Sequence, residues 1–208
     1  MIPLMLDLKG RTVLIFGGGE VGARKAAFFR HEADVTVVSR SFSHEIERMP
    51  VRRIQADLAA ASDDALRALL AGVFLAVAAT PDPALNTRIG EICRSIGVFF
   101  NNAAGEQGDV LIPSVIRGEH YVVAISTFGM SPAVPRYLRL MLEREYAELD
   151  GMIELQAELR ALLQESEPSP KRRAAILRDV VCDADVWAAL ASDREKARLI
   201  AEERYLHA

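Results

Sequence analysis

Residues 12–25 read TVLIFGGGEVGARK, and this stretch decides the fold of the chain. Five apolar or β-branched residues run directly into three glycines, and a helix-forming segment follows. The pattern G-x-G-x-x-G has a physical meaning in this position, between a strand and a helix. Gly17 permits the tight turn, Gly19 lets a phosphate approach the backbone, and Gly22 lets the helix pack closely on the strand. The stretch therefore predicts a dinucleotide site with the pyrophosphate at the start of the helix.

Strand and helix patterns alternate from this stretch to about residue 103. Strands are expected at 12–16, 35–38, 51–55, 73–78 and 98–100, with helical segments at 20–30, 62–72 and 81–97. The run at 73–78 is apolar without polar alternation, as expected of a strand buried on both faces. Such alternation predicts an α/β fold, a doubly wound parallel sheet of the Rossmann type.

The pattern then changes. Two apolar runs, 110–112 and 121–126, predict an antiparallel hairpin with a turn at Arg117-Gly118, and the chain from Pro132 onward has helical patterns interrupted at 166–170. The expected domains are a dinucleotide-binding domain (1–109), a dimerisation and substrate element (110–150) and a C-terminal helical domain (151–208). Because a two-stranded pair is not stable without a cover, we expect a homodimer.

Composition limits the function classes. The net charge of -4 over 208 residues argues against a nucleic-acid surface. Cys93 and Cys182 are too few and too far apart for a disulfide framework or a metal site. The longest apolar run, 71–79, is well short of the roughly 20 residues of a membrane helix, and Asp7 and Lys9 interrupt the apolar start that a signal peptide needs. The sequence therefore predicts a cytoplasmic protein without nucleic-acid or membrane partners.

Four spaced stretches carry a family resemblance. Residues 17–25 are similar to GGG-x-V-A-x-R-K, residues 78–86 to A-A-T-x-D-x-x-L-N, and residues 124–132 to A-I-S-T-x-G-x-S-P, while Ile112-Pro113-Ser114 matches a short strand-end motif. In this order, over residues 2 to about 145, the chain resembles the precorrin-2 dehydrogenases, which include the N-terminal module of siroheme synthase. The resemblance implies NAD-dependent oxidation of precorrin-2 to sirohydrochlorin, with the active site at a domain junction. Some relatives also insert Fe²⁺, so a bifunctional dehydrogenase and ferrochelatase is an alternative.

The cofactor residues are expected at the carboxyl ends of the strands, where open α/β sheets bind ligands. They are Gly17, Gly18, Gly19, Glu20, Val21, Ser39, Arg40, Ser41, Thr80, Asp82 and Asn86. Asp82 and Asn86 serve equally well as helix-capping residues. Ser39 and Arg40 stand where an NAD site often has an acidic residue, and Arg40 suits the 2′-phosphate of NADP. The resemblance puts NAD first, and the local residues leave NADP open.

The catalytic position departs from the family pattern. Relatives commonly carry an Asp in N-x-[AV]-D as general acid/base, whereas this chain has Ala104 there. We expect Asp109, with Glu106 as second candidate, to take that role, unless the dehydrogenation needs no such group or Asp109 is an ordinary loop residue. The four histidines are scattered without ligand spacing, so we expect no metal site and place chelation behind dehydrogenation.

Precorrin-2 carries many carboxylates, so its site needs donors and positive charge. The candidates are Asn101, Asn102, Ser126, Thr127, Ser131 and Arg136. Ser131 is equally suited to cap a helix, and Arg136 to the polar face of one. A second alternative, a Rossmann-type nucleotide-sensing regulatory protein, normally keeps an acidic residue after its second strand and has no need of the segment from Ser126 to Pro132.

Overall fold

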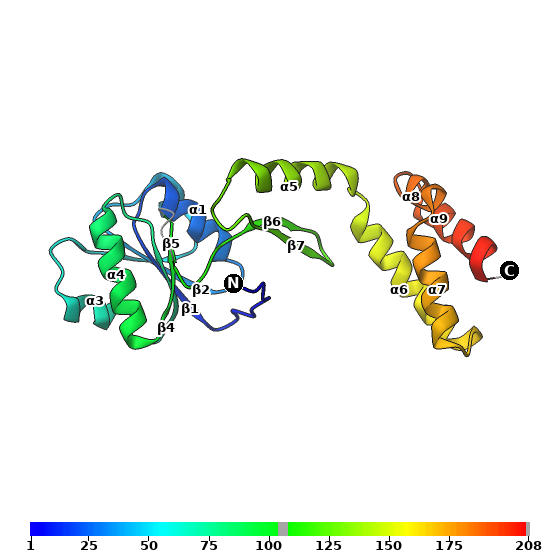
Figure 1. Ribbon diagram of the computed structural model, residues 1–208. Helices are drawn as coiled ribbons and strands as arrows, with labels where there is room; N and C mark the ends of the chain where they lie inside the picture. The colour runs from blue at the N-terminus through cyan, green and yellow to red at the C-terminus, as the bar shows by residue number, and fades with distance from the viewer. Residues whose placement is uncertain (104–107, 207–208) are drawn as a thin grey trace. The chain divides into compact units, whose positions relative to one another are not determined.

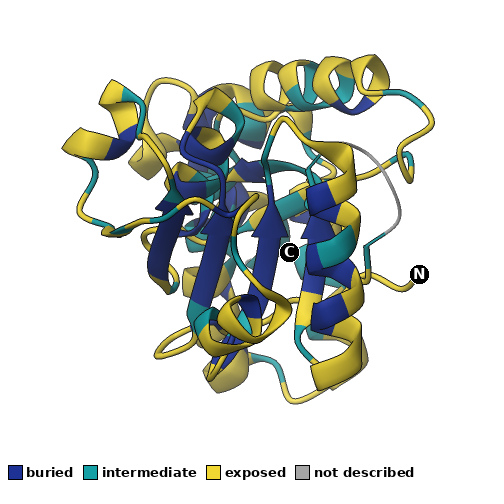
Figure 2. Ribbon diagram, turned by 90° about the vertical axis from the view of Figure 1, so that its left-hand side faces the viewer, coloured by how far each residue is buried: buried dark blue, intermediate teal, exposed yellow. Residues whose placement is uncertain are grey.

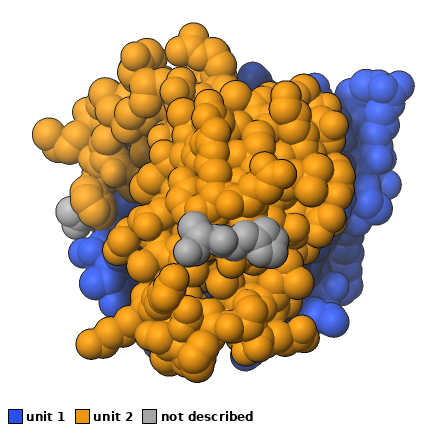
Figure 3. All heavy atoms as spheres, turned by 90° about the vertical axis from the view of Figure 1, so that its right-hand side faces the viewer, with its two compact units in different colours: residues 1–112 blue, residues 113–208 orange. Residues whose placement is uncertain are grey.

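The structure is a computed structural model that describes residues 1–103 and 108–206. These residues form two compact units, Met1–Ile112 and Pro113–Ala208, which Figure 3 shows in separate colours. The first unit ends three residues after the boundary expected at residue 109. The second contains both the hairpin and the helical block, so the further division at residue 150 stays a prediction.

A five-stranded sheet forms the centre of the first unit (Figure 1). Its strands are β1 (Thr12–Phe16), β2 (Asp34–Ser39), β3 (Arg52–Gln55), β4 (Val73–Ala78) and β5 (Phe99–Asn102), in the order β3-β2-β1-β4-β5. Every pairing is parallel. This confirms the predicted doubly wound sheet. The strand order reverses between β1 and β4, where such sheets open a crevice at their carboxyl ends.

Helices cover both faces of this sheet. They are α1 (Glu20–Phe29), α2 (His44–Arg48), α3 (Asp63–Leu69) and α4 (Pro83–Ile96). Successive residues of β1 point to opposite faces, so Leu14 and Phe16 join a core with α3 and α4, whereas Val13 and Ile15 join a core with α1 and α2. Figure 2 shows the central strands as buried and the outer helix faces as exposed.

The start and end of α4 follow from its sequence. Asp82 caps the helix: its Oδ1 accepts from the N–H groups of Ala84 at 2.9 Å and Leu85 at 3.3 Å. Pro83 occupies the first turn, where its missing N–H costs nothing. Gly97, in the left-handed region with φ of 73°, ends the helix as predicted.

The second unit begins with the hairpin, and here one prediction was wrong. The paired strands are β6 (Ser114–Arg117) and β7 (Val122–Ile125), so 110–112 is not a hairpin strand and Arg117 lies in a strand instead of the turn. The segment 110–112 stays with the first unit because the Val110 N–H donates to the Phe100 carbonyl oxygen at 3.0 Å and its apolar side chains pack on the core there.

Helices complete this unit: α5 (Ala133–Glu145), α6 (Leu149–Ser166), α7 (Pro170–Val181), α8 (Ala184–Leu190), α9 (Arg194–Ala201) and a π-helical turn η1 (Glu202–Leu206). The predicted break at 166–170 is confirmed between α6 and α7. Asp183 and Asp193 cap α8 and α9, and these two helix breaks were not predicted. Within the described ranges, no helix combines the length and the apolar character needed to cross a membrane.

Candidate functional site

A cavity of about 670 Å³ lies in the first unit, where β1, β2, β3 and β4 end. Its walls come from the glycine turn, the segment after β2, the segment after β3 and the turn between β4 and α4. They are lined by Gly17, Gly18, Gly19, Glu20, Val21, Ser39, Arg40, Ser41, Phe42, Ser43, Ala56, Asp57, Leu58, Ala59, Ala79, Thr80, Pro81, Asp82 and Leu85. The cavity therefore brings together all predicted cofactor residues except Asn86.

The glycine turn has no room for side chains at two of its positions. Gly17 has a φ of 120°, and a Cβ there would lie 2.4 Å from the carbonyl oxygen of Ala79. A Cβ on Gly18 would lie 2.0 Å from the carbonyl oxygen of Ser41. The turn is thus held tightly between the ends of β2 and β4, which fixes its backbone along the cavity wall.

The N-terminus of α1 remains open beside this turn. Gly19 is the N-cap, and having no side chain it makes no capping hydrogen bond. The first backbone bond of the helix runs from the Ala23 N–H to the Gly19 carbonyl oxygen, so the N–H groups of Glu20, Val21 and Gly22 lack a partner within the helix. A Cβ on Gly19 would meet no atom within 4 Å. Open amides at a helix start suit a pyrophosphate, so this part of the cavity fits the predicted dinucleotide.

The end of β2 offers hydroxyls and a guanidinium instead of a carboxylate. Ser39 is half-buried, and Arg40 and Ser41 are exposed along the cavity. Gln55 of β3 holds this end in place, because its Nε2 donates to the Arg40 carbonyl oxygen at 3.0 Å. An acidic residue that was not predicted, Asp57, lines the cavity after β3. Asp57 follows the predicted strand 51–55, and the carboxyl ends of strands bind ligands in this fold, so the sequence could have predicted it.

The predicted residues in and after the turn between β4 and α4 differ in whether they line the cavity. Thr80 and Asp82 line the cavity. Asn86 is 0% exposed and lies behind them, with its side-chain amide bonded to Thr80. The structure therefore places Asn86 outside the cavity wall.

The predicted residues after β5 lie apart from the cavity lining. Asn101 is buried: its Nδ2 donates to the Val110 carbonyl oxygen at 2.8 Å, and its Oδ1 has no hydrogen-bond partner within the described ranges. Asn102 is 9% exposed at the end of the strand. Asp109 is exposed. Burial raises the pKa of the Cys93 thiol to about 12, and the negative charge of Asp109 adds to this effect. Ala104 and Glu106 lie outside the described residues.

The other predicted substrate residues belong to the second unit, in the loop between β7 and α5. The Thr127 hydroxyl donates to the Ser131 carbonyl oxygen at 2.7 Å and accepts from the Ser131 N–H at 3.2 Å. Ser126 Oγ accepts from the Phe128 N–H at 3.1 Å, and Ser131 Oγ from the Val134 N–H at 3.4 Å. These hydroxyls therefore shape the loop and the start of α5, and Arg136 is exposed one turn further on.

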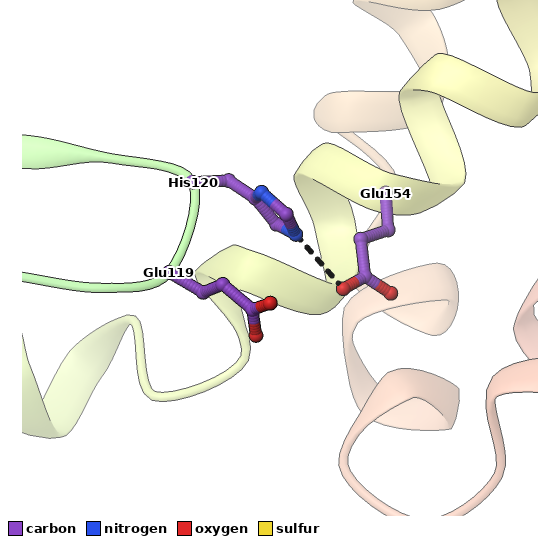
Figure 4. Close-up of side chains that lie close together, drawn as sticks. All are labelled: Glu119, His120 and Glu154. Atoms are coloured by element: carbon purple, nitrogen blue, oxygen red, sulfur yellow. Dashed lines mark hydrogen bonds and ion pairs between the residues drawn. The ribbon is translucent and has the colours of Figure 1, made fainter.

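The structure also gives His120 a defined environment (Figure 4). Its Nε2 lies 3.1 Å from Glu154 Oε1 of α6, and Arg194 of α9 pairs with the other oxygen of Glu154. Asp150 accepts the backbone N–H groups of Glu119 at 3.0 Å and His120 at 2.8 Å. Ligand atoms of Glu119, His120 and Glu154 lie within 4.8 Å of one another. These bonds tie the hairpin tip to α6, a grouping that sequence spacing did not reveal.

A second cavity, of about 690 Å³, lies beside α6 and α9. Its charged lining residues are largely paired: Arg194 with Glu158, and Arg198 with Glu195. It contains no predicted site residue, and its walls offer no concentration of one charge.

Known proteins resemble this chain along nearly its whole length. A family model described as "Putative NAD(P)-binding" matches residues 4–114. The chain is 42% identical to the precorrin-2 dehydrogenase of Methanosarcina barkeri, over 94% of this chain and 89% of that one. It is 32% identical to the siroheme synthase of Stutzerimonas stutzeri, over 97% of this chain but 44% of the larger enzyme.

Among solved structures, SirC, a precorrin-2 dehydrogenase, aligns with a TM-score of 0.70 and 26% identity, over 98% of this chain and 100% of that one. The matches to the two dehydrogenases include the helical block as well as the sheet domain. The chain therefore belongs to the precorrin-2 dehydrogenase family.

Proposed function

We propose that this protein is an oxidoreductase that uses NAD⁺ to oxidise precorrin-2 to sirohydrochlorin, a step in siroheme synthesis. The observation that carries the proposal is the open N-terminus of α1 beside Gly19, at a cavity of about 670 Å³, in a chain with this family relationship. A regulator that only senses nucleotides is disfavoured, because the likeness to dehydrogenases covers the second unit as well.

In this proposal, different parts of the cavity wall bind different parts of the nucleotide. The backbone N–H groups of Glu20 and Val21, which line the cavity, bind the pyrophosphate, with the positive end of the α1 dipole behind them. Ser39 and Arg40 lie where the adenosine ribose is bound in this fold. Thr80 and Asp82 line the wall at the end of β4. When bound, the nicotinamide supplies the hydride acceptor.

The oxidation removes one hydride and one proton from the macrocycle. The hydride passes to the nicotinamide, and the proton passes to water or to a side chain. Asp109 stays our prediction for that side chain, although it does not line the cavity. Because aromatisation drives the reaction and the pyrrole nitrogens can lose protons to water, the step does not require a carboxylate.

Donors for the substrate carboxylates come from Asn101, Asn102, Ser126, Thr127, Ser131 and Arg136 in this proposal. Arg136 is the strongest of these because a guanidinium binds a carboxylate through two parallel hydrogen bonds. The side chain is exposed on α5, and no ion pair with it is found within the described ranges.

A homodimer is part of the proposal. Apolar side chains stay exposed along β7, the following loop and α5: Val122, Phe128, Met130, Val134, Tyr137 and Leu140. Met130 is 89% exposed and Tyr137 65%. Large apolar side chains exposed together on neighbouring elements are typical of an interaction site. A second copy of the chain, which presents the same surface about a two-fold axis, is the simplest partner.

The cytoplasm is the proposed location because both cysteines are free thiols, which suits a reducing compartment.

The test mixes purified protein with NAD⁺ and precorrin-2 under anaerobic conditions and follows NADH together with the sirohydrochlorin spectrum. We expect both to form in equal amounts at a rate proportional to protein. Replacing NAD⁺ with NADP⁺ in a parallel reaction gives the cofactor preference. Nucleotide binding without any NADH above the protein-free rate would refute the enzymatic proposal and favour a nucleotide sensor.

A further inference from the structure

The buried amide of Asn86 makes three hydrogen bonds to a single residue of the cavity wall. Its Oδ1 lies 2.7 Å from the Thr80 hydroxyl and 3.3 Å from the Thr80 N–H, and its Nδ2 donates to the Thr80 carbonyl oxygen at 3.0 Å. A backbone N–H can only donate and a carbonyl can only accept, so this pattern fixes which end of the amide is the oxygen. Both backbone polar groups of Thr80 are therefore used inside the protein.

The proton of the Thr80 hydroxyl is directed to protein atoms. An amide oxygen cannot donate, so the hydroxyl is the donor in the 2.7 Å contact with Asn86 Oδ1, and the Asp82 carbonyl oxygen, at 3.2 Å, is a second and longer acceptor for the same proton. The Asp82 N–H at 3.3 Å occupies one acceptor position of the hydroxyl oxygen. A hydroxyl has two such positions, so one remains. Towards a ligand in the cavity, Thr80 can act as an acceptor and not as a donor.

This arrangement also supports the glycine turn. The main chain of residues 79–80 lies against Gly17, where an added Cβ would be 2.4 Å from the Ala79 carbonyl oxygen and 3.1 Å from the Thr80 nitrogen. The Ala79 N–H donates to the Phe16 carbonyl oxygen at 2.8 Å. A shift of Thr80 would therefore disturb the backbone that faces the pyrophosphate.

We propose that Asn86 is a positioning residue that holds the Thr80 hydroxyl as a hydrogen-bond acceptor for the bound nucleotide. The inference rests on the proposed function and names the group that Thr80 recognises: a neutral donor, either the carboxamide N–H of the nicotinamide or a ribose hydroxyl. Asn86 itself does not touch the nucleotide. Its presence in the sequence motif at residues 78–86 then reflects the geometry of Thr80.

Calorimetric titration with NAD⁺ tests this without any turnover. Thr80→Val keeps the side-chain shape but removes the hydroxyl, and we expect about a tenfold higher Kd from the lost hydrogen bond. Asn86→Ala should raise the Kd by about tenfold or more. Because Asn86 acts through Thr80, the Kd of the double variant should equal the higher of the two single-variant Kd values. The two increases in Kd should not multiply. Thr80→Ser should bind like the wild type.

Two control variants separate positioning from loss of stability. Thr87→Ala changes the exposed neighbour of Asn86 on α4, and Ser62→Ala removes the N-cap of α3 and destabilises the same unit. Both should leave the Kd for NAD⁺ unchanged. If Asn86→Ala does not fold, the Thr80 variants still decide whether the hydroxyl is used.

The donor is identified with deamido-NAD⁺, in which a carboxylate replaces the carboxamide. If the carboxamide donates to Thr80, the wild type should bind deamido-NAD⁺ about tenfold more weakly than NAD⁺. The Thr80→Val variant, which has no acceptor there, should bind the two nucleotides with equal affinity. If a ribose hydroxyl donates, Thr80→Val should weaken both nucleotides alike. Unchanged affinity in Thr80→Val, or fully multiplicative effects in the double variant, would overturn the inference. A wild type that binds no nucleotide would instead refute the proposed function.

Discussion

Gly22 of α1 lies against the carbonyl oxygen of Gly17, so closely that a Cβ on Gly22 would be 2.0 Å from that oxygen. This contact joins the first turn of α1 to the glycine turn. It fixes where the open N–H groups of the helix point, and it explains the third glycine of the motif as a packing requirement.

Gly22→Ala is expected to destabilise the first unit and to impair nucleotide binding. The added methyl group must displace backbone, which costs about 1–3 kcal/mol of unfolding free energy, and the displaced amides should raise the Kd for NAD⁺ at least about tenfold, as loss of a hydrogen bond to a charged group does. Thermal unfolding and calorimetry measure the two effects.

The matched comparison is Gly19→Ala. Its Cβ would point into open space, and its φ of -84° suits any residue. The melting temperature should stay near the wild-type value while nucleotide binding weakens, because the methyl group occupies the space before the α1 amides. Equal loss of stability in both variants would contradict this account of the two glycines.

The residues at the end of β2 should set the choice between the two nucleotides. Ser39→Asp places a carboxylate beside the ribose hydroxyls, where it accepts hydrogen bonds from NAD⁺ and repels the 2′-phosphate of NADP⁺. We expect the ratio of the Kd for NADP⁺ to the Kd for NAD⁺ to rise by about tenfold or more, which is the effect of one hydrogen bond to a charged group. Arg40→Ala should weaken NADP⁺ more than NAD⁺, whereas Arg48→Ala, on α2 outside the cavity lining, should change neither.

The exposed face of α5 provides a test of the proposed dimer. Tyr137→Asp introduces a charge in the apolar surface and should give a monomer, measured by analytical ultracentrifugation at a fixed protein concentration. Arg144→Asp, exposed near the end of the same helix, should keep the wild-type mass. Identical masses for wild type and Tyr137→Asp would show that this surface is not the interface.

The stability of the second unit should depend on pH through Asp150. The two backbone N–H groups at the hairpin tip, those of His120 and then Glu119, hold the pKa of the Asp150 carboxyl below its usual value of 3.8. A carboxyl with a lowered pKa in the folded state stabilises the fold above its unfolded pKa and loses that contribution as the pH falls through the folded value. Acid should therefore weaken this unit below about pH 4.

Trp187, the single tryptophan, lies in α8 and packs edge-on against Tyr146 with ring centroids 5.9 Å apart, so its fluorescence follows this unit alone. Unfolding by denaturant should show that Asp150→Asn is less stable than the wild type at neutral pH. The difference should shrink at the acid end of the range. A constant difference at every pH would exclude this role of Asp150.

The two thiols should differ in reactivity. Cys93 is buried and its pKa is raised to about 12, whereas Cys182 is exposed. Because the thiolate is the nucleophile, iodoacetamide at pH 8 should alkylate Cys182 and leave Cys93 unmodified until the protein is unfolded. Mass spectrometry of the peptides gives the sites. Cys182→Ser should then show almost no labelling in the folded state.

Local signals in the sequence determined much of the first unit. The five apolar runs became the strands of the sheet, and Gly97 ended its helix where predicted. The glycine pattern placed the turn beside β1. Each of these signals works over a few neighbouring residues, through backbone conformation, capping or the period of a strand, so it can be recognised without knowing the rest of the fold.

Contacts between distant residues were decided by the tertiary structure. Residues 110–112 pack on the core of the first unit, so the paired strands of the hairpin lie further along the chain. His120 and Glu154 are 34 residues apart in the sequence, so no short-range pattern predicts their contact. Asn86 is buried behind Thr80, and Asp109 lies outside the cavity lining, because packing decides which polar groups face a cavity. The sequence alone determined the type of fold and the place of its nucleotide site, and the tertiary structure decided which side chains reach that site.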